Sequence, residues 1–242
     1  MIAEDLPILH EDPWLVAVDK PSGLAVHRGW AHDDVVLTDL LEERYGRDGV
    51  HLLGRLDRGT SGVLLVARNG GDVESFREAL RAGEGERCYV ALVRGVPPDS
   101  GLVDYPIPNE PGGPRVEALT SFRLLASRPT EPRTVSLVAA FPQTGRLHQV
   151  RRHLRHITHP LIGDANYGRP DLNRALRAAY GLARLALHCP QVRFRHPFSG
   201  ELLELAAPLP DDLAGPLAKM GFEPKDWAVG SDSPGAIHGE GA

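Results

Sequence analysis

Short apolar runs, each about the length of one strand and bounded by turn-forming residues, recur along this chain. They cover residues 14–18, 63–67, 88–93, 134–140 and 185–187, and two more runs at 192–195 and 202–205 predict a hairpin. Helical spacing of apolar residues is confined to 38–45, 73–80, 147–156, 172–182 and a short segment from Asp211. Because strands and helices do not alternate regularly, the pattern predicts an α+β fold with a mixed, mostly antiparallel sheet flanked by helices.

No internal repeat or break in composition divides the 242 residues. We therefore expect a single domain over residues 1–222. A disordered tail is expected over 223–242, much of which is Gly, Ser, Pro and Asp without apolar periodicity. Residues 96–118 are rich in Pro and Gly and predict an irregular surface excursion.

Composition excludes several classes of protein. Cys88 and Cys189 have no metal-ligand spacing, so both are expected to be free, buried thiols. No apolar run approaches the roughly 20 residues of a membrane span, and the acidic start lacks the basic segment of a signal peptide. We expect a cytoplasmic protein that does not bind membranes. The absence of a GxGxxG or P-loop motif argues against a nucleotide cofactor.

The charge of the chain is unevenly distributed. The net charge is −5, which argues weakly against a nucleic-acid partner, yet no acidic residue occurs between Glu131 and Asp164. That interval holds five arginines and four histidines, namely Arg133, Arg146, Arg151, Arg152, Arg155, His148, His153, His156 and His159. A basic sector on an acidic body is the kind of field that steers a polyanion to one face.

The stretch from Gly54 to Gly62 places Asp57 between Arg55 and Arg58, just before the apolar run 63–67. A carboxylate in a loop between buried strands is well placed for function, because a rigid scaffold fixes a side chain that still reaches solvent. A surface cluster of ion pairs in a hairpin explains the same residues. The local pattern alone leaves both interpretations open.

A second candidate region begins at a Gly turn before the predicted helix 147–156, whose first turn is expected to carry Arg146 and His148. A helix N-terminus has free N–H groups and positive potential, so it suits an RNA phosphate or the Asp57 carboxylate. The buried stripe of this helix is predicted to be Leu147, Val150 and Leu154, and the arginines that fall off it are Arg151, Arg152 and Arg155. A solvated basic helix is the alternative.

Histidines in this region also allow a metal or phosphoesterase interpretation. His153, His156 and His159 are three residues apart, but the arginines around them disfavour a dication, so no metal site is expected. His156 and Thr158 match half of a two-histidine phosphoesterase motif, and the second half is missing from the sequence. Tyr89, in the run 88–93, fits either a half-buried core tyrosine or a stacking plate for a base.

Taken together, these motifs resemble the RluA-type pseudouridine synthases. The resemblance rests on Arg55-Leu-Asp57 with Thr60-Ser61-Gly62, on Tyr89-Val-Ala-Leu-Val, and on the run from Thr144 to Leu154 that leads to Pro160-Leu-Ile-Gly-Asp164 and Tyr167-Gly168. Leu187-His188 and His196-Pro197 complete the set. Within the family, Asp19-Lys-Pro-Ser-Gly23 and Asp104-Tyr-Pro106 resemble the TruC-like branch that modifies uridine 65 of tRNA.

The resemblance implies the pseudouridine synthase fold without an S4 RNA-binding module, and isomerisation of a uridine within RNA. It implies no cofactor, and RNA, above all tRNA, as the partner of a monomer. The implied catalytic residues are Asp57 as the essential carboxylate, Tyr89 stacked on the flipped uracil, and Arg146 paired with Asp57. The implied RNA contacts are Arg55, which fills the gap left by the flipped base, and Arg58, His148, Arg151, Arg152 and Arg155.

Two positions depart from the family pattern. Gly54 stands where relatives usually have His, and Arg87 stands where they usually have Lys. Ribosomal RNA or another tRNA position is the alternative target. A non-catalytic RNA-binding protein on the same scaffold is the competing class, although a carboxylate beside the basic region would repel phosphate. A metal phosphoesterase is the third class.

Overall fold

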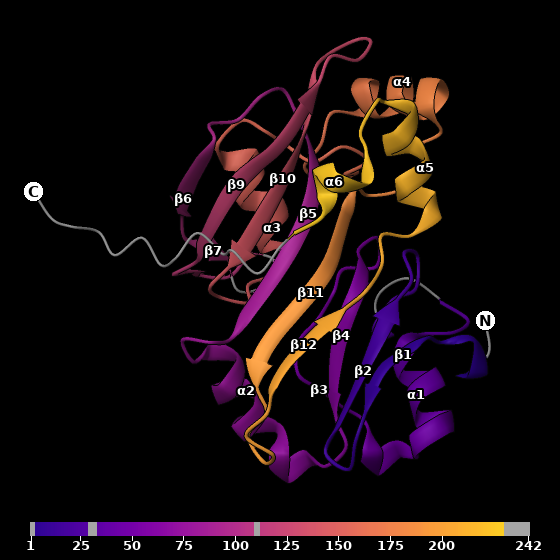
Figure 1. Cartoon of the computed structure of the whole chain (residues 1–242), viewed down its shortest axis with the longest axis vertical. Coiled ribbons are helices and arrows are strands. Elements are labelled where there is room, and N and C mark those ends of the chain that lie inside the picture. Colours follow the sequence, from indigo (N-terminus) through magenta and orange to yellow (C-terminus); the bar gives the residue numbers. More distant parts are fainter. Residues whose placement is uncertain (1–2, 29–32, 109–111, 230–242) are drawn as a thin grey trace, which may run out of the picture.

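One long, twisted sheet runs through the whole molecule, and helices cover its two faces and its ends (Figure 1). The structure is a computed structural model, and it describes residues 3–28, 33–108 and 112–229. The strands of the sheet are β1 (Ile8–Glu11), β2 (Leu15–Lys20), β3 (His51–Leu52), β4 (Ser61–Ala67), β5 (Glu86–Arg94), β6 (Ser100–Asp104), β9 (Leu119–Arg128), β10 (Val135–Pro142), β11 (Leu187–Arg195) and β12 (Leu202–Ala206).

Strand order along the sheet is β1-β2-β4-β11-β5-β10-β9-β6, with β3 paired to β4 and β12 paired to β11. Among the described strands, β4 and β11 pair in parallel and the other pairings of this sheet are antiparallel. The predicted mixed, mostly antiparallel sheet is therefore confirmed.

Helices of the described residues are α1 (Leu37–Tyr45), α2 (Val73–Arg81), α3 (Gln149–His156), α4 (Pro170–Tyr180), α5 (Asp211–Lys219) and α6 (Pro224–Trp227). Single 3-10 turns occur at Ala3–Asp5, Arg47–Gly49 and Gly70–Asp72. In Figure 1, α1 and α2 lie at one end of the sheet, while α4 and α5 lie beside each other at the other end.

Apolar side chains of β5 point alternately to the two faces of the sheet, which explains why both faces are covered. Successive strand residues point to opposite faces. Val90 and Leu92 accordingly join the core cluster that includes residues of α4 and α5, whereas Ala91 and Val93 join the cluster that includes residues of α3. Tyr89 follows the second set, so it lies on the face that carries α3.

The start of α3 is fixed by the side chain of Gln149. Its Oε1 accepts hydrogen bonds from the Arg146 amide at 3.0 Å and the Thr144 hydroxyl at 2.7 Å, and its Nε2 donates to the Leu119 carbonyl at 2.8 Å. These bonds attach the turn before α3 to β9. The helix therefore begins at Gln149, and the predicted placement of Arg146 and His148 in its first turn is wrong.

Two other expectations need correction. The region 96–118 is not wholly irregular, because it contains β6 and a small hairpin of β7 (Ile107–Pro108) and β8 (Arg115–Val116), with residues 109–111 outside the described part. The disordered tail predicted over 223–242 is wrong for 223–229. There, α6 is held by an ion pair of Asp226 with Arg128 at 2.6 Å, and Trp227 packs on the core. Residues 230–242 lie outside the described part.

Gly62 is required where β4 and β11 run in parallel. It pairs with Cys189, and its φ of +112° lies in a region that residues with a Cβ rarely adopt. A Cβ at this position would lie 2.1 Å from the Cys189 carbonyl oxygen. The close approach of the two strands therefore depends on glycine at position 62.

Gly62→Ala is expected to destabilise the fold by more than about 3 kcal/mol, because the new methyl group must displace backbone atoms and strain φ. Gly83→Ala is the matched control, since nothing lies within 4 Å of a Cβ there. Urea denaturation followed by circular dichroism measures both variants. A Gly62→Ala midpoint equal to that of the wild type would contradict this account of the β4–β11 contact.

Candidate active site

Asp57 lies in the loop that connects β3 to β4. The Thr60 amide donates to the Asp57 carbonyl at 3.0 Å, which closes a tight turn just before the buried strand begins. The side chain of Asp57 is 22% exposed, so it can meet a substrate while its backbone is fixed. This is the arrangement that the sequence suggested for a functional loop carboxylate.

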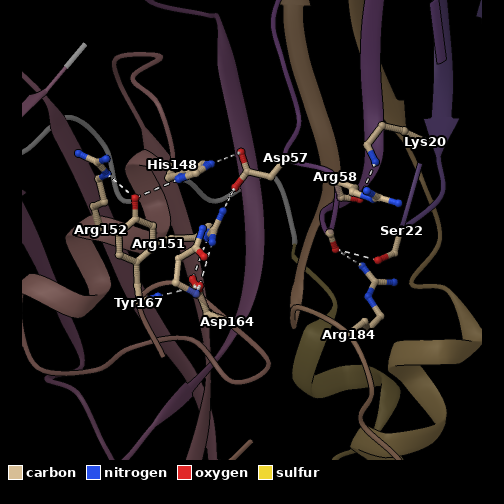
Figure 2. A network of polar contacts seen from close by, with 12 residues as sticks. Lys20, Ser22, Asp57, Arg58, His148, Arg151, Arg152, Asp164, Tyr167 and Arg184 are labelled. Atoms are coloured by element: carbon tan, nitrogen blue, oxygen red, sulfur yellow. Dashed lines mark hydrogen bonds and ion pairs between the residues drawn. The ribbon is translucent and has the colours of Figure 1, made fainter. Parts of the chain in front are cut away.

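Buried polar groups hold the two carbonyls that follow Asp57 (Figure 2). The Arg58 carbonyl accepts from the Gly23 amide at 2.8 Å and from Lys20 Nζ at 3.3 Å. The Gly59 carbonyl accepts from the Ser22 hydroxyl at 2.8 Å and from Arg184 Nη2 at 3.3 Å. Segments far apart in the sequence therefore fix the loop that carries Asp57.

Lys20 is fully buried, and its ammonium group also donates to the carbonyls of Pro21 and Leu24, both at 2.8 Å. Burial, together with the Arg184 cation, lowers the pKa of Lys20 to about 7, although Asp57 and Asp19 oppose this shift. Sequence analysis did not single out Lys20 or Arg184. Lys20 ends an apolar run and belongs to the Asp19-Lys-Pro-Ser-Gly23 motif, but no pattern in the sequence assigned it a contact with the loop of Asp57. Arg184 belongs to none of the motifs.

A single arginine joins two carboxylates on the other side of Asp57. Arg151 Nη1 donates to Asp57 Oδ2 at 2.7 Å, while its Nε and Nη2 donate to the two oxygens of Asp164 at 2.7 and 2.8 Å. The planar fork of donors in a guanidinium suits such bidentate pairing. Burial alone would lower the pKa of Arg151, but the bonds to Asp164 and Asp57 raise it above its ordinary range.

The expectation that Arg146 pairs with Asp57 is wrong. Arg146 Nε instead donates to the Glu117 carbonyl at 3.0 Å. Arg151 takes the predicted role, and it is buried at 7% exposure, so it is not an exposed phosphate contact. The prediction failed because α3 begins three residues later than Arg146, and because Arg151 was expected to face solvent.

Asp164 occupies a buried turn that presents its carboxylate to Arg151. Its Oδ1 also accepts from the amides of Asn166 and Tyr167, at 2.9 and 3.0 Å. Burial disfavours the charged form of Asp164, but the Arg151 bonds and these amides outweigh it and lower the carboxyl pKa. Asp164 therefore stays ionised and orients Arg151 toward Asp57.

His148 faces the second oxygen of Asp57, and Nε2 lies 3.8 Å from Asp57 Oδ1. Its other ring nitrogen, Nδ1, lies 3.0 Å from the Tyr167 hydroxyl, which also accepts from Arg152 Nε at 2.8 Å. Burial lowers the pKa of His148 despite the opposing charge of Asp57. The imidazole is therefore neutral at neutral pH.

Tyr89 is half-buried on β5, on the same face as α3. Burial raises the pKa of its hydroxyl well above the ordinary range, and the negative charge of Asp57 adds to the shift. The phenol therefore stays protonated at neutral pH. Tyr89 is not among the residues that line the cavity beside Asp57.

Asp57 opens into a cavity of about 470 Å³. Such a volume is in the range of small-molecule and nucleotide sites. Its charged and ring-bearing lining consists of His27, Arg55, Asp57, Arg58, His148, Arg151 and Asp164. The sequence-predicted residues Asp57, Arg55, Arg58 and His148 are thus brought together around one space.

Comparison with known proteins assigns the chain to a family. A model of the RNA pseudouridylate synthase family matches residues 14–156, more than half of the chain. The chain belongs to this family. It is therefore an enzyme, a pseudouridine synthase, and the resemblance inferred from its motifs is confirmed.

Individual relatives extend over most of this synthase. The tRNA pseudouridine synthase C of Yersinia pestis is 34% identical over 236 residues, which cover 90% of this chain and 91% of that protein. The tRNA pseudouridine synthase C of Pectobacterium carotovorum subsp. carotovorum is 35% identical over 239 residues, but this chain spans 63% of its length. The solved structure of human RNA pseudouridylate synthase domain containing 4 is 28% identical, with a TM-score of 0.72, over 91% of this chain and 96% of that one.

The other arginines that were predicted to contact RNA differ in exposure and in their hydrogen bonds and ion pairs. Arg58 is exposed but tied to Asp33 at 2.9 Å and to the Gly23 carbonyl at 3.0 Å. Arg152 bonds Tyr167, whereas Arg155 and Arg55 are exposed. The structure thus keeps these four arginines on the surface or at the cavity edge, and separates them from the buried Arg151.

The cysteines, possible metal ligands and helix lengths of the synthase can be compared with the expectations from its sequence. Cys88 and Cys189 are free and buried, as expected. In the described ranges of the chain, no group of three His, Cys, Asp or Glu side chains could hold a metal ion. Within those same ranges, no helix has the length and apolarity needed to cross a membrane.

Asp164→Asn is expected to destabilise the synthase by about 3 kcal/mol at pH 7, because it leaves the buried Arg151 with one carboxylate partner. The lowered pKa of Asp164 means that its charge stabilises the fold above about pH 4 and stops doing so as the pH falls through the lowered value. The difference from the wild type should therefore be constant between pH 7 and 5 and shrink below pH 4. Urea denaturation across this range measures it, and a difference that grows on acidification would contradict the ion pair.

Proposed function

We propose that this synthase converts a uridine of tRNA to pseudouridine, and that uridine 65 is its target. The named tRNA synthases among its relatives support the class of RNA. The TruC-like motifs of its sequence support the position. The observation that carries the proposal is the Asp57–Arg151 ion pair at a cavity of the size of a nucleotide.

The two oxygens of Asp57 have different surroundings, and this division suits the reaction. Oδ2 is committed to Arg151 at 2.7 Å, whereas Oδ1 has His148 at 3.8 Å, beyond hydrogen-bond distance. Oδ1 is therefore the oxygen free to attack C1′ or to remove the C2′ proton. Both routes require a carboxylate oxygen that is not already bonded to a protein group.

Tyr89 fits the role of a stacking plate better than that of a base. A phenol with a raised pKa stays protonated and does not accept the C5 proton at neutral pH. Its ring lies on the same face of the sheet as α3, which supplies Arg151. A uracil flipped toward Asp57 would stack on this ring, which is how flipped bases are commonly held.

RNA binding is proposed for the arginines that remain accessible. Arg55 is exposed at the cavity, where it can fill the gap left by the flipped base. Arg146, Arg152 and Arg155 lie on or just before α3 and are placed for phosphate contacts. Each contact neutralises phosphate charge, so binding should weaken with salt. We propose that the protein acts as a monomer in the cytoplasm.

The target proposal is tested with tRNA transcripts that carry 5-tritiated uridine, because isomerisation releases the C5 proton. Wild-type protein is expected to release tritium from a transcript with uridine 65 and none when position 65 is cytidine. Asp57→Asn should abolish release while tRNA binding stays within about threefold, because the amide is neither a nucleophile nor a base. Release from the cytidine-65 transcript would move the target to another position, and near-normal turnover by Asp57→Asn would overturn the mechanism.

Changing each arginine to lysine distinguishes the proposed roles of Arg151 and Arg146. Arg151→Lys is expected to lower the single-turnover rate at least 100-fold, because an ammonium group cannot bridge Asp57 and Asp164. Arg146→Lys should keep the rate and change only affinity and its dependence on salt. Rapid-quench measurements at saturating enzyme give the rates. Equal rate losses in both variants would contradict the assignment of Arg151 as the partner of Asp57.

A further inference from the structure

His148 has an unusual backbone for its place in the chain. It is the residue before α3, where the backbone is normally extended. Its φ of 54° and ψ of 32° instead lie in the left-handed region. A non-glycine residue is strained there, and such strain persists mainly where surrounding contacts enforce a functional geometry. Thr158, with φ 70°, follows the end of α3, where this conformation is common.

Contacts on the far side of the ring favour one of the two positions for its proton. Arg152 Nε can only donate, so the Tyr167 oxygen accepts at 2.8 Å. The phenol proton is then free to be donated to His148 Nδ1, 3.0 Å away. This ordering satisfies all three groups and leaves the proton of the neutral ring on Nε2.

Nε2 of His148 points toward Asp57 and the cavity beside it. Figure 2 shows the ring between Tyr167 and Asp57, with Nε2 on the Asp57 side. The 3.8 Å gap to Asp57 Oδ1 is too long for a hydrogen bond, so the N–H group is unused. His148 also lines the cavity. An N–H donor is therefore presented beside the oxygen that faces the substrate.

We propose that His148 is a catalytic residue of this synthase, and that Tyr167 is the positioning residue that keeps its proton on Nε2. The Nε2–H group donates a hydrogen bond to a carbonyl oxygen of the uracil while the base is detached from the ribose. This inference rests on the uridine isomerisation proposed above. It replaces the expected phosphate contact of His148, because the ring faces a carboxylate that repels phosphate.

The uracil needs a neutral hydrogen-bond donor once its bond to the ribose has broken. When the N1–C1′ bond breaks, its electron pair stays with the uracil, and the negative charge is shared with the ring carbonyls. A fixed N–H group aimed at such a carbonyl stabilises that charge and holds the base while it turns. His148 transfers no proton to the base, so the uracil anion keeps the electron pair that forms the C5–C1′ bond. The C5 proton is then released to solvent, and N1 takes up a proton. The same need arises whether Asp57 attacks C1′ or removes the C2′ proton.

A charged imidazolium would serve less well at this position. It would pair with Asp57 Oδ1 and withdraw the free oxygen from the reaction. The charged groups that face the ring are Asp57, Arg151, Arg152 and Asp164, and burial with the two arginines outweighs the carboxylates in lowering the pKa of His148. The environment therefore keeps the ring neutral while it lies next to a carboxylate.

Three substitutions separate this role from a structural one. Asn tolerates the left-handed backbone but its amide is too short to reach the position of Nε2, so His148→Asn should lower the single-turnover rate about 100-fold, with tRNA affinity within about threefold. His148→Gln places an amide N–H near Nε2 and should recover at least tenfold of that loss. Tyr167→Phe removes only the hydroxyl and should lower the rate about tenfold. Tyr45→Phe, whose hydroxyl binds Glu11 at 2.9 Å, is the matched control and should keep the wild-type rate.

Nitrogen NMR of histidine-labelled protein tests the tautomer without RNA. The His148 signals are assigned from their absence in His148→Asn. Wild-type protein should show a bare Nδ1 and a protonated Nε2 at pH 7.5, and Tyr167→Phe should show a mixture of tautomers. This measurement stands even if the wild type proves inactive on tRNA, so it separates failure of this inference from failure of the proposed function.

Three results would overturn the inference. The first is a proton on Nδ1 of His148 in the wild type. The second is a wild-type rate in His148→Asn. The third is a His148→Asn variant whose loss is confined to affinity and its salt dependence, which would return His148 to a phosphate contact.

Discussion

The bridge from Arg151 to two carboxylates is the interaction on which the rest of the site depends. A buried guanidinium needs compensating charge, and Asp164 supplies it with two hydrogen bonds at 2.7 and 2.8 Å. The third donor direction is then left for Asp57 at 2.7 Å. Asp164 thus fixes the plane of Arg151, and Arg151 fixes one oxygen of Asp57. The loop of Asp57, the basic helix α3 and the 163–168 turn are joined through one side chain.

A second support approaches Asp57 from the opposite side. The Arg184 side chain donates to the Gly59 carbonyl and to the Ser61 hydroxyl, at 3.3 and 2.7 Å. Its backbone carbonyl lies so close to Gly163 that a Cβ there would be 1.8 Å away. One residue therefore contacts both the loop of Asp57 and the turn of Asp164. This explains how two loops distant in the sequence keep the spacing that the Arg151 bridge requires.

Local pattern was sufficient for part of this structure. Apolar runs between turn signals predicted β2, β4, β5, β10 and the β11–β12 hairpin, and the position of Asp57 before a buried strand made its loop a candidate. The partner of Asp57 was not predictable in this way, because a five-residue shift from Arg146 to Arg151 depends on where α3 begins. That start is set by contacts of Gln149 with β9, a strand that the apolar runs of the sequence did not predict. Lys20 and Arg184 both hold backbone carbonyls of the loop, and such contacts cannot be read from the spacing of residues in the sequence.

The two departures from the family pattern lie next to each other in space. A Cβ on Gly54 would be 3.6 Å from Arg87 Nη2, so the guanidinium occupies the side of Gly54 where a larger side chain would extend. The same nitrogen lies 3.5 Å from the Leu53 carbonyl, in the strand-to-loop segment that leads to Asp57. Arg87 also opposes the rise in the pKa of Tyr89, so its charge is felt at that phenol. The long guanidinium at 87 and the missing side chain at 54 therefore complement each other, because the guanidinium lies where a side chain at position 54 would extend.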